Sequence, residues 1–378
     1  MNWEIELLFT ALLALAYTWA GYPLLLWLLS KMFRRRWARG QNHLPFSIIV
    51  AVHNEHDQIG AKLQNCLSLR YPEEAMEIIV ASDGSTDSTE RTVADWAAGD
   101  QRIKLVRTEG RQGKSGAQNV AASQARGEIL LFTDAGTRMQ SDLLERIASD
   151  FAEPAVGMVA PVVQMRGFGG CVSRSQGAYW RFEVWLRQME SAVGILATAS
   201  GSAFAVRREL FRPIPLQFGD DCIVPLQIRL QGFKILQDSE AVVFDAMPHS
   251  VEDELRTRIR MTTRNWSGTL SRSAWLNPLR FPGTTWGLIS HKVLRWLTPF
   301  LLAAAFVSNV LLAHSPTWAL LLVLQAGFYG AAVIGWRCSR QHQCARIFGY
   351  PFAFCLANLG FLLGVVRSLR GQTVIAYK

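Results

Sequence analysis

The sequence predicts an α/β domain with a mainly parallel, doubly wound sheet, joined to helices that span a membrane. Short apolar runs alternate with helical stretches through the middle of the chain, and long uncharged stretches lie near both ends. Polar clusters follow directly after several of the short apolar runs. Alternating strands and helices favour parallel pairing, because each crossover helix returns the chain to the same edge of the sheet.

The composition favours a membrane protein over a nucleic-acid-binding protein. Of the 378 residues, 50% are hydrophobic, and the mean hydropathy of +0.13 is high for a soluble chain. The formal net charge is +9, but the basic residues cluster beside apolar segments. This arrangement indicates membrane lipid as a partner and no nucleic acid.

The first membrane helix is expected at residues 7–30, which carry no charged side chain and are long enough to cross a bilayer. The basic stretch KMFRRRWARG follows this run, whereas a signal peptide has its basic residues before a shorter apolar core. The positive-inside rule therefore predicts an N-terminus outside and a cytoplasmic chain from Lys31 onward. We assign residues 1–40 to this helix and its basic flank.

Three further membrane spans are expected within residues 292–378. No Asp, Glu, Lys or Arg occurs from 296 to 336, AHSPTW divides this run, and a last uncharged stretch covers 347–366. Residues 270–291 mix Trp, Leu and Pro and are expected as an interfacial segment at the headgroups. The stretch CSRQHQC matches no standard zinc-finger spacing and is interpreted as a basic cytoplasmic loop.

The polar domain at residues 41–269 begins with four expected strands. They are FSIIVAV (46–52), EIIVASD (77–83), IKLVRT (103–108) and EILLFTD (128–134). Helical spacing follows the first strand at 55–69, and Ser85 or Asp87 is available to cap a helix after the second. Beyond about Phe151 the pattern is less regular. There, YWRFEVWLRQMES is typical of a helix, SGSAFAVRREL of a turn and short strand, and GDDCIVPLQIRLQGFKIL of a helix followed by a strand.

A ligand site is expected where the first four strands end. In doubly wound sheets, ligands bind beyond the carboxyl ends of the strands. The polar residues at these ends are His53, Asn54, Glu55, Asp83, Lys114 and Asp134. Their shared placement is the strongest local sign of a site.

Lys114 lies in a glycine-rich loop, EGRQGKSGAQNVAA, whose Gly-Lys-Ser sequence is typical of phosphate-binding loops. A Walker A loop requires the pattern G-x-x-x-x-G-K-[ST], and the position of its first glycine holds Thr108. The loop also follows the third expected strand, and no G-x-G-x-x-G follows the first strand. These departures disfavour a Walker loop and, more strongly, a dinucleotide-binding fold.

Six motifs together resemble those of membrane-embedded family 2 glycosyltransferases with the GT-A fold. They are VAVHNE (50–55), VASDGSTDST (80–89), GRQGKSGAQN (110–119), LLFTDAGT (130–137), ASGSAFAVRREL (199–210) and FGDDCIVPLQIRLQGFK (218–234). They cover the polar domain in the family's order. With the flanking membrane helices, the chain is similar to bacterial exopolysaccharide and cell-surface polysaccharide glycosyltransferases.

The resemblance implies a nucleotide-sugar donor, expected to be a UDP-sugar. It assigns donor binding to Val52, His53, Asn54, Glu55, Asp83, Lys114 and Asp134. Asp83 is expected to accept hydrogen bonds from the base or ribose, with the capping of a turn in SDGSTD as the alternative. Lys114 is expected to face the base and diphosphate, with a solvated surface lysine as the alternative.

Asp134 resembles the first carboxylate of the family's D-x-D metal motif, which implies a Mg²⁺ or Mn²⁺ ion that bridges diphosphate oxygens. The third position of the motif is Gly136 in this chain. The cation would then be held by Asp134, water and the diphosphate. His249 is a conceivable further ligand, and an ordinary loop histidine is the simpler interpretation.

Asp220 and Asp221 stand where the family has its acidic pair. Inverting transfer is a single displacement at the anomeric carbon, and it needs a base that removes the proton from the acceptor hydroxyl. Alignment to the second member of the pair assigns the base to Asp221, with support from Asp220. The alternative is that both carboxylates only favour a helix N-terminus.

The residues expected on the acceptor or diphosphate side are Gly201, Ser202, Arg260, Arg264 and Trp266. Processive synthases carry Q-x-x-R-W after the acidic pair. Here the glutamine is absent and the tryptophan is displaced by one residue, which argues against processivity. A further group either lines the acceptor side or forms a helix packed on the sheet: Tyr179, Trp180, Arg181 and Glu183.

The function implied by the resemblance is inverting sugar transfer to a lipid-linked or growing saccharide at the cytoplasmic face of a bacterial inner membrane. The partners would be the donor, the acceptor, membrane lipid and polysaccharide-export proteins. One alternative is a processive polysaccharide synthase coupled to export. Alternatives from other classes are a P-loop membrane ATPase, which Thr108 disfavours, and an inactive membrane scaffold, which Gly136 alone favours.

Overall fold

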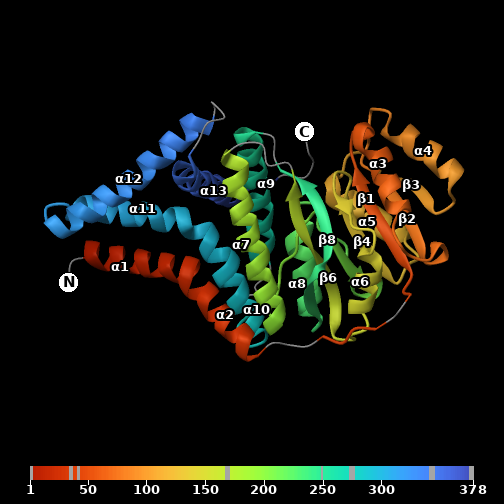
Figure 1. Cartoon of the computed structure of the whole chain (residues 1–378), viewed down its shortest axis with the longest axis horizontal. Coiled ribbons are helices and arrows are strands. Elements are labelled where there is room, and N and C mark those ends of the chain that lie inside the picture. Colours follow the sequence, from red (N-terminus) through yellow and green to blue (C-terminus); the bar gives the residue numbers. More distant parts are fainter. Residues whose placement is uncertain are drawn as a thin grey trace.

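The structure is a computed structural model that describes residues 3–33, 37–40, 43–166, 171–247, 250–271, 277–339 and 345–373. It has two parts, an α/β domain built on one sheet and a group of long apolar helices (Figure 1). Two helices, α7 (Cys171–Val193) and α9 (Val251–Leu270), stand between these parts. His249 and most of the CSRQHQC loop, from residue 340 to 344, lie outside the described residues.

One eight-stranded sheet forms the centre of the α/β domain, in the order β3-β2-β1-β4-β7-β6-β8-β5. The strands are β1 (Phe46–Val52), β2 (Met76–Ser82), β3 (Ile103–Arg107), β4 (Ile129–Asp134), β5 (Arg138–Met139), β6 (Val156–Arg166), β7 (Ala203–Arg207) and β8 (Lys234–Ala246). The first four pair in parallel, as β6 and β8 also do, whereas β7 runs antiparallel to β4 and β6. The expected α/β class is confirmed, with mixed pairing beyond β4.

The four strands expected first along the chain are confirmed to within one residue at each end. The apolar runs of β1, β2 and β4 are almost entirely buried, as parallel strands with helices on both faces require, whereas β3 at the edge of the sheet is only partly buried. Because these strands run in the same direction, their carboxyl ends share one edge of the sheet. That edge carries the loops that hold Asp83, Lys114 and the residues after Asp134.

Helices cover both faces of the sheet. One face carries α3 (His56–Leu67), α4 (Thr89–Gly99) and α6 (Leu143–Asp150), and the other carries α5 (Gly113–Gln124) and α8 (Asp220–Leu230). Ile59 and Leu63, one turn apart on α3, contribute to the first core. Asp87, one of the two expected caps, accepts the backbone N–H of Thr89 at 2.9 Å where α4 begins.

Four helical stretches are long and apolar enough to cross a bilayer, judged by length and composition, and they indicate membrane association. They are Trp3–Met32, Pro282–Leu312, Pro316–Ser339 and Ile347–Leu369. The first contains α1 (Trp3–Ala16) and α2 (Tyr22–Met32), the second α10 (Pro282–Leu288) and α11 (Leu294–Leu312), and the others lie in α12 (Pro316–Ser339) and α13 (Arg346–Leu369). Helix α1 packs on α11, and α13 packs on α9 and α7.

Part of the stretch 270–291, expected as an interfacial segment, is helical and continues into an apolar helix. From Pro282 onward the chain is helical and continues through a π-helical turn, Ile289–Val293, into α11. Pro282 occupies the first helical turn, where its missing N–H costs nothing. Residues 272–276 lie outside the described residues, and a headgroup position for the rest of the segment stays a prediction.

Arg39 fixes the connection between the first apolar stretch and the sheet. Its guanidinium meets Asp150 at the end of α6 (Nε–Oδ1 3.2 Å) and Asp238 on β8 (Nη2–Oδ1 2.8 Å). Both carboxylates are almost fully buried. Burial, together with the charge of Asp238, raises the pKa of Asp150 to about 8, against the opposing pull of Arg39. One half-exposed guanidinium therefore meets two buried carboxyl groups, and folding favours the protonated form of Asp150.

We expect Asp150→Asn to gain stability relative to the native protein as the pH rises. An acid whose pKa is raised by folding contributes stability that is complete below its unfolded pKa of about 3.9 and is lost as the pH rises through its folded pKa, which is about 8. Asparagine cannot ionise, so the variant avoids this loss. The difference in unfolding free energy should change by up to about 1.4 kcal/mol per pH unit in that range. Thermal unfolding in detergent across a pH series measures it.

The control for this experiment is Glu240→Gln. Glu240 contacts the same guanidinium (Nη1–Oε2 2.7 Å), but its side chain is 54% exposed. The hydrogen bond from Arg39 lowers the pKa of Glu240, so its replacement should leave the pH dependence of stability unchanged above the ordinary titration range of a glutamate. Equal pH dependence of the Asp150 variant and the native protein would show that burial does not protonate this carboxyl group.

Candidate active site

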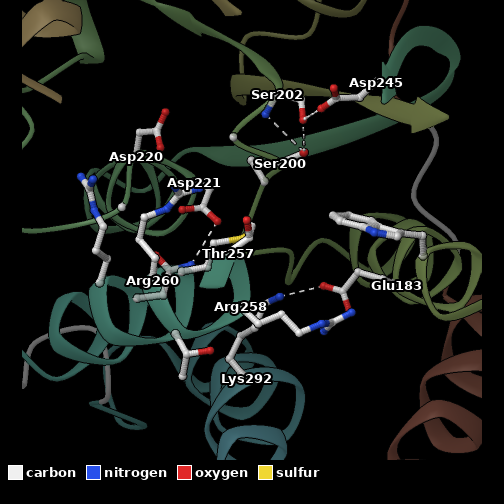
Figure 2. Close-up of a pocket in the computed structure, with 18 of the residues that line it drawn as sticks. Glu183, Ser200, Ser202, Asp220, Asp221, Asp245, Thr257, Arg258, Arg260 and Lys292 are labelled. Atoms are coloured by element: carbon white, nitrogen blue, oxygen red, sulfur yellow. Dashed lines mark hydrogen bonds and ion pairs between the residues drawn. The ribbon is translucent and has the colours of Figure 1, made fainter. Parts of the chain in front are cut away.

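A cavity of about 340 Å³ opens beyond the carboxyl end of β4. Its walls come from that strand end, the turn before β7, the first residues of α8, and the facing sides of α7 and α9. Figure 2 shows Asp220 and Asp221 on one side of the cavity and Glu183 on the other. The expected site residues that line it are Lys114, Asp134, Tyr179, Trp180, Glu183, Gly201, Ser202, Asp220, Asp221, Arg260 and Arg264.

Lys114, near the start of α5, joins three walls of the cavity. Its ammonium donates to the carbonyl oxygen of Gly201 (2.8 Å) and forms ion pairs with Asp134 Oδ1 (2.7 Å) and Asp220 Oδ2 (3.1 Å). Only 13% of the Lys114 side chain is exposed, so the alternative of a solvated surface lysine is wrong. The ammonium is placed where it neutralises two carboxylates of the cavity at once.

The two neighbouring carboxylates of α8 have unequal environments. Burial alone would raise the pKa of Asp220, but the charge of Lys114 and a hydrogen bond from Gln118 Nε2 (2.8 Å) hold it below its usual value. Burial and the charge of Asp220 raise the pKa of Asp221, and a hydrogen bond from Asn265 Nδ2 (3.1 Å) partly opposes this. Asp221 is therefore the more basic carboxylate of the pair.

Asp83 organises the glycine-rich loop. Its two carboxylate oxygens accept the backbone N–H groups of Gln112 (2.7 Å) and Gly113 (2.8 Å), and Oδ1 also accepts the hydroxyl of Thr108. Asp83 is buried and does not line the cavity. A Walker loop aims its backbone N–H groups at phosphate oxygens, whereas two of these N–H groups are bound to a carboxylate. This geometry disfavours a phosphate cradle.

The cluster after β1 lies beside the turn that holds Asp83 and does not line the cavity. Val52 ends β1, and His53 Nδ1 lies 2.9 Å from the carbonyl oxygen of Asp83. Asn54 has a left-handed φ of 55°, and its Oδ1 accepts the N–H of Thr86 at 2.8 Å. Burial and the charge of Asp134 raise the pKa of the Glu55 carboxyl. None of these residues lines the cavity, and their contacts to the donor stay a prediction.

The expected acceptor-side residues of α9 do not all face the cavity. Arg260 and Arg264 line the cavity, and Arg264 Nη2 donates to Ser115 Oγ at 2.8 Å and to the carbonyl oxygen of Phe218. Trp266 does not line it. This side chain is buried against Trp296 of α11, with ring centroids 6.0 Å apart. Helical periodicity explains this difference, because residues two positions apart, such as Arg264 and Trp266, point to nearly opposite faces of a helix. The structure gives Trp266 a packing position between helices.

Glu183 on α7 is the centre of a buried charge cluster between the sheet domain and the apolar helices. It binds Lys292 Nζ (2.7 Å), Arg295 Nη1 (2.5 Å) and His291 Nε2 (3.1 Å). Burial would raise the pKa of this carboxyl, but these cationic neighbours hold it well below its usual value. The other side of the His291 ring meets Glu190, which also accepts the hydroxyl of Tyr22 at 2.6 Å.

Of the alternatives left open for this part of α7, the packed helix is confirmed, and an acceptor-side role stays a prediction. The helix packs between the sheet and the apolar helices, and three of the four named side chains, Tyr179, Trp180 and Glu183, line the cavity. Arg181 is not among the described residues that line it.

Asp134 and Asp245 offer two carboxylates to a hard divalent cation, whose other ligands would be water and the diphosphate. Asp134 and Asp245 both line the cavity, and Asp245 Oδ2 accepts the hydroxyl of Ser202 at 2.6 Å. Burial and the charges of Asp220 and Asp245 raise the pKa of Asp134, whereas Lys114 opposes this. A cation would relieve that repulsion, and carboxylate oxygens are the ligands that Mg²⁺ and Mn²⁺ prefer. Within the described part of the chain, no group of three His, Cys, Asp or Glu side chains could hold a metal.

Sequence reasoning missed several polar residues of the cavity, among them Asp245 and Asn265. Asp245 lies one residue before the end of β8. Asp134 likewise lies at the end of β4, so a carboxylate at a strand end was the signal that could have identified Asp245. Asn265 directly follows Arg264 on the face of α9 that meets Asp221. No local pattern distinguishes this amide from an ordinary helix-surface residue.

Comparison with known proteins identifies the family of the α/β domain. Residues 47–214 match the model of glycosyl transferase family 2. A beta-monoglucosyldiacylglycerol synthase of Nostoc sp. is 30% identical over 180 residues, which are 45% of this chain and 37% of the synthase. A poly-beta-1,6-N-acetyl-D-glucosamine synthase of Staphylococcus epidermidis is 24% identical over 220 residues, which are 57% of this chain and 53% of that synthase. The match thus spans about half or less of the length of these curated relatives.

The similarity to a solved structure extends over nearly the whole chain. A mannosyltransferase of Pyrobaculum calidifontis, in complex with GDP-Man and Mn²⁺, has a TM-score of 0.70 and 25% identity, over 93% of this chain and 99% of that one. Its complex contains a nucleotide sugar together with a divalent cation. Residues 47–214 are therefore a family 2 glycosyltransferase domain with the GT-A fold.

Proposed function

We propose that the protein transfers a sugar, with inversion, from a nucleotide-sugar donor to a lipid-linked or growing saccharide at the membrane, in glycolipid or polysaccharide synthesis. The observation that carries this proposal is the unequal pair Asp220 and Asp221, placed in one cavity that also reaches the apolar helices. Inverting transfer needs one base, and the pair contains one carboxylate suited to that role.

Asp221 is the proposed base. A carboxylate paired with a lysine is a weak base because the ion pair must be broken when the proton arrives. Asp220 is in that situation, with Lys114 3.1 Å away. Asp221 accepts a hydrogen bond from the neutral amide of Asn265 and has a raised pKa, so it takes a proton from the acceptor hydroxyl more readily. Asp220 keeps Lys114 in place and adds negative charge beside the base.

The lining of the cavity supports an acceptor that arrives from the membrane. Trp296 belongs to α11 and Phe361 to α13, and both line the same cavity as Asp221. A saccharide on a lipid carrier would reach the base while its apolar part stays among the membrane helices. The basic residues after the first helix favour a cytoplasmic sheet domain, with the N-terminus of the chain outside.

The donor diphosphate is proposed to bind between Lys114, Arg260 and Arg264, with a divalent cation held by Asp134 and Asp245. When bound, the cation supplies positive charge that stabilises the departing nucleoside diphosphate. The chain's own part is to add contacts from Lys114 to the diphosphate while Asp220 keeps its ion pair with this lysine. The relatives named above differ in the sugar they handle, so we leave the nucleotide of the donor to the experiment.

Two alternatives carry less support. A membrane ATPase would need the loop amides that Asp83 occupies. A processive synthase of the Q-x-x-R-W type would be expected to use its motif tryptophan at the acceptor, whereas Trp266 is packed on Trp296. Export partners stay a prediction that no feature of the described residues supports.

We expect Asp221→Asn to lower turnover by roughly a hundredfold or more, because the acceptor proton loses its base. Donor binding should change little. Turnover is measured as nucleoside diphosphate released from GDP-mannose, UDP-glucose or UDP-N-acetylglucosamine, with a bacterial lipid extract as the source of acceptor. The control is Glu252→Gln, a change at an exposed carboxylate of α9. Turnover of the Asp221 variant within a few-fold of the native rate would refute the assignment.

We expect Asp134→Ala to uncouple the binding of nucleoside diphosphate from the divalent cation. Calorimetry in the presence of Mg²⁺, Mn²⁺ or chelator should show tighter binding with metal for the native protein and a smaller difference for the variant. Gly136→Asp should tighten metal binding, since a side chain at Gly136 would meet only the flexible end of Gln58, at 2.8 Å from Cβ. Equal affinities with metal and with chelator in the native protein would exclude the metal role.

We expect Lys114→Ala to weaken donor diphosphate binding by about one to two decades, the value of roughly 1.5–3 kcal/mol for a charge-assisted contact. Lys114→Gln is the matched variant, because it keeps an N–H donor for the Gly201 carbonyl oxygen and removes only the charge. One titration with UDP, GDP and ATP separates the functions. Tight ATP binding, with hydrolysis that depends on Lys114, would instead identify a nucleotide-hydrolysing loop.

A further inference from the structure

We propose that Asn265 is a positioning residue for transfer and holds the Asp221 carboxylate in the cavity through its side-chain amide. This inference rests on the proposed function, because it takes Asp221 as the base. Asn265 comes from α9 and Asp221 from the first turn of α8, and both line the cavity. The amide Nδ2 donates to Asp221 Oδ2 at 3.1 Å.

Gly219 leaves the space that this pair needs. A Cβ atom at Gly219 would lie 2.2 Å from Asn265 Oδ1 and 2.6 Å from Asp221 Oδ1, which is closer than van der Waals contact allows. The φ of Gly219 is −76°, a value open to any residue, so its conformation does not require glycine. The requirement is steric, because the amide and the carboxylate meet against its bare Cα.

The orientation of the amide follows from its partner. Asp221 Oδ2 is an acceptor, so Asn265 must present Nδ2 to it, and Oδ1 then faces Gly219. This Oδ1 is buried and has no hydrogen-bond partner among the described residues. A buried unpaired acceptor costs free energy. An amide kept here only for packing would gain little from this arrangement, which points to a role on the Asp221 carboxylate.

A neutral donor suits a base better than a cationic donor. Several charged groups act on Asp221: Asp220 on the same helix raises its pKa, and Lys292 and Lys114 from neighbouring elements lower it. A lysine in direct contact would fix the carboxylate and also remove its basicity, as Lys114 does for Asp220. The amide of Asn265 fixes the carboxylate and leaves it able to accept a proton.

The test compares pH–rate profiles of the full-length chain and three variants. Asn265→Ala removes the hydrogen bond, and Asn265→Asp keeps the shape but places a second carboxylate against Asp221. Ser267→Ala is the control on the same helix. It removes contacts to Thr263 and Ser368 away from the cavity. Turnover is followed with the nucleotide sugar that the native enzyme uses best among GDP-mannose, UDP-glucose and UDP-N-acetylglucosamine, with the same lipid extract.

The acid limb of the profile should move to higher pH by about half a unit to one unit in Asn265→Ala and by roughly two units in Asn265→Asp. The KM for the donor should stay unchanged, and Ser267→Ala should follow the native profile. If the acid limb lies at the native pH in both Asn265 variants, even with lower rates, the positioning role would be overturned. Retained turnover in Asp221→Asn would refute the base assignment itself, so the two failures can be told apart. Size-exclusion profiles confirm that each variant is folded.

Discussion

The ammonium group of Lys114 is the contact on which the cavity depends. It joins the end of β4 through Asp134, the turn before β7 through Gly201, and the start of α8 through Asp220. Lys114 is itself placed by Asp83, which binds the backbone of the preceding loop. A chain of contacts therefore runs from the sheet edge to the acidic pair. Because Lys114 keeps Asp220 ionised, the charge of Asp220 in turn raises the pKa of its neighbour.

The first half of the domain could be predicted well because its rules are local. Strands β1 to β4 are short apolar runs followed by polar turns, and their bounds were predicted to within one residue. Shared strand direction then places Asp134 and Lys114 at one edge. Beyond residue 151 the local rules weaken. Strand β6 contains Pro161, which disfavours a strand prediction. Its neighbours β7 and β8 come from much later in the chain, so no short sequence pattern predicts it.

The misses at the site have the same origin. Trp266 was expected near the acceptor from a motif spacing, but the turn of α9 directs it to Trp296. Asn265, its neighbour, faces the cavity because α9 crosses α8 at this point. Whether a helical residue meets a ligand or another helix depends on the rotation of that helix, and tertiary packing sets the rotation. Local sequence therefore identified the chemistry of Asp220 and Asp221 and not the amide that contacts them.

The charge cluster of Glu183 has a consequence for biogenesis. Its partners at positions 291, 292 and 295 are synthesised more than a hundred residues later. At typical rates of translation, that delay is roughly 5–20 s. During this interval Glu183 lacks the cationic partners that the second apolar stretch supplies, and its burial is unfavourable. Helix α7 therefore reaches its final packing after the second apolar stretch, Pro282–Leu312, has been synthesised. Completion of the cavity is thus coupled to assembly of the membrane helices.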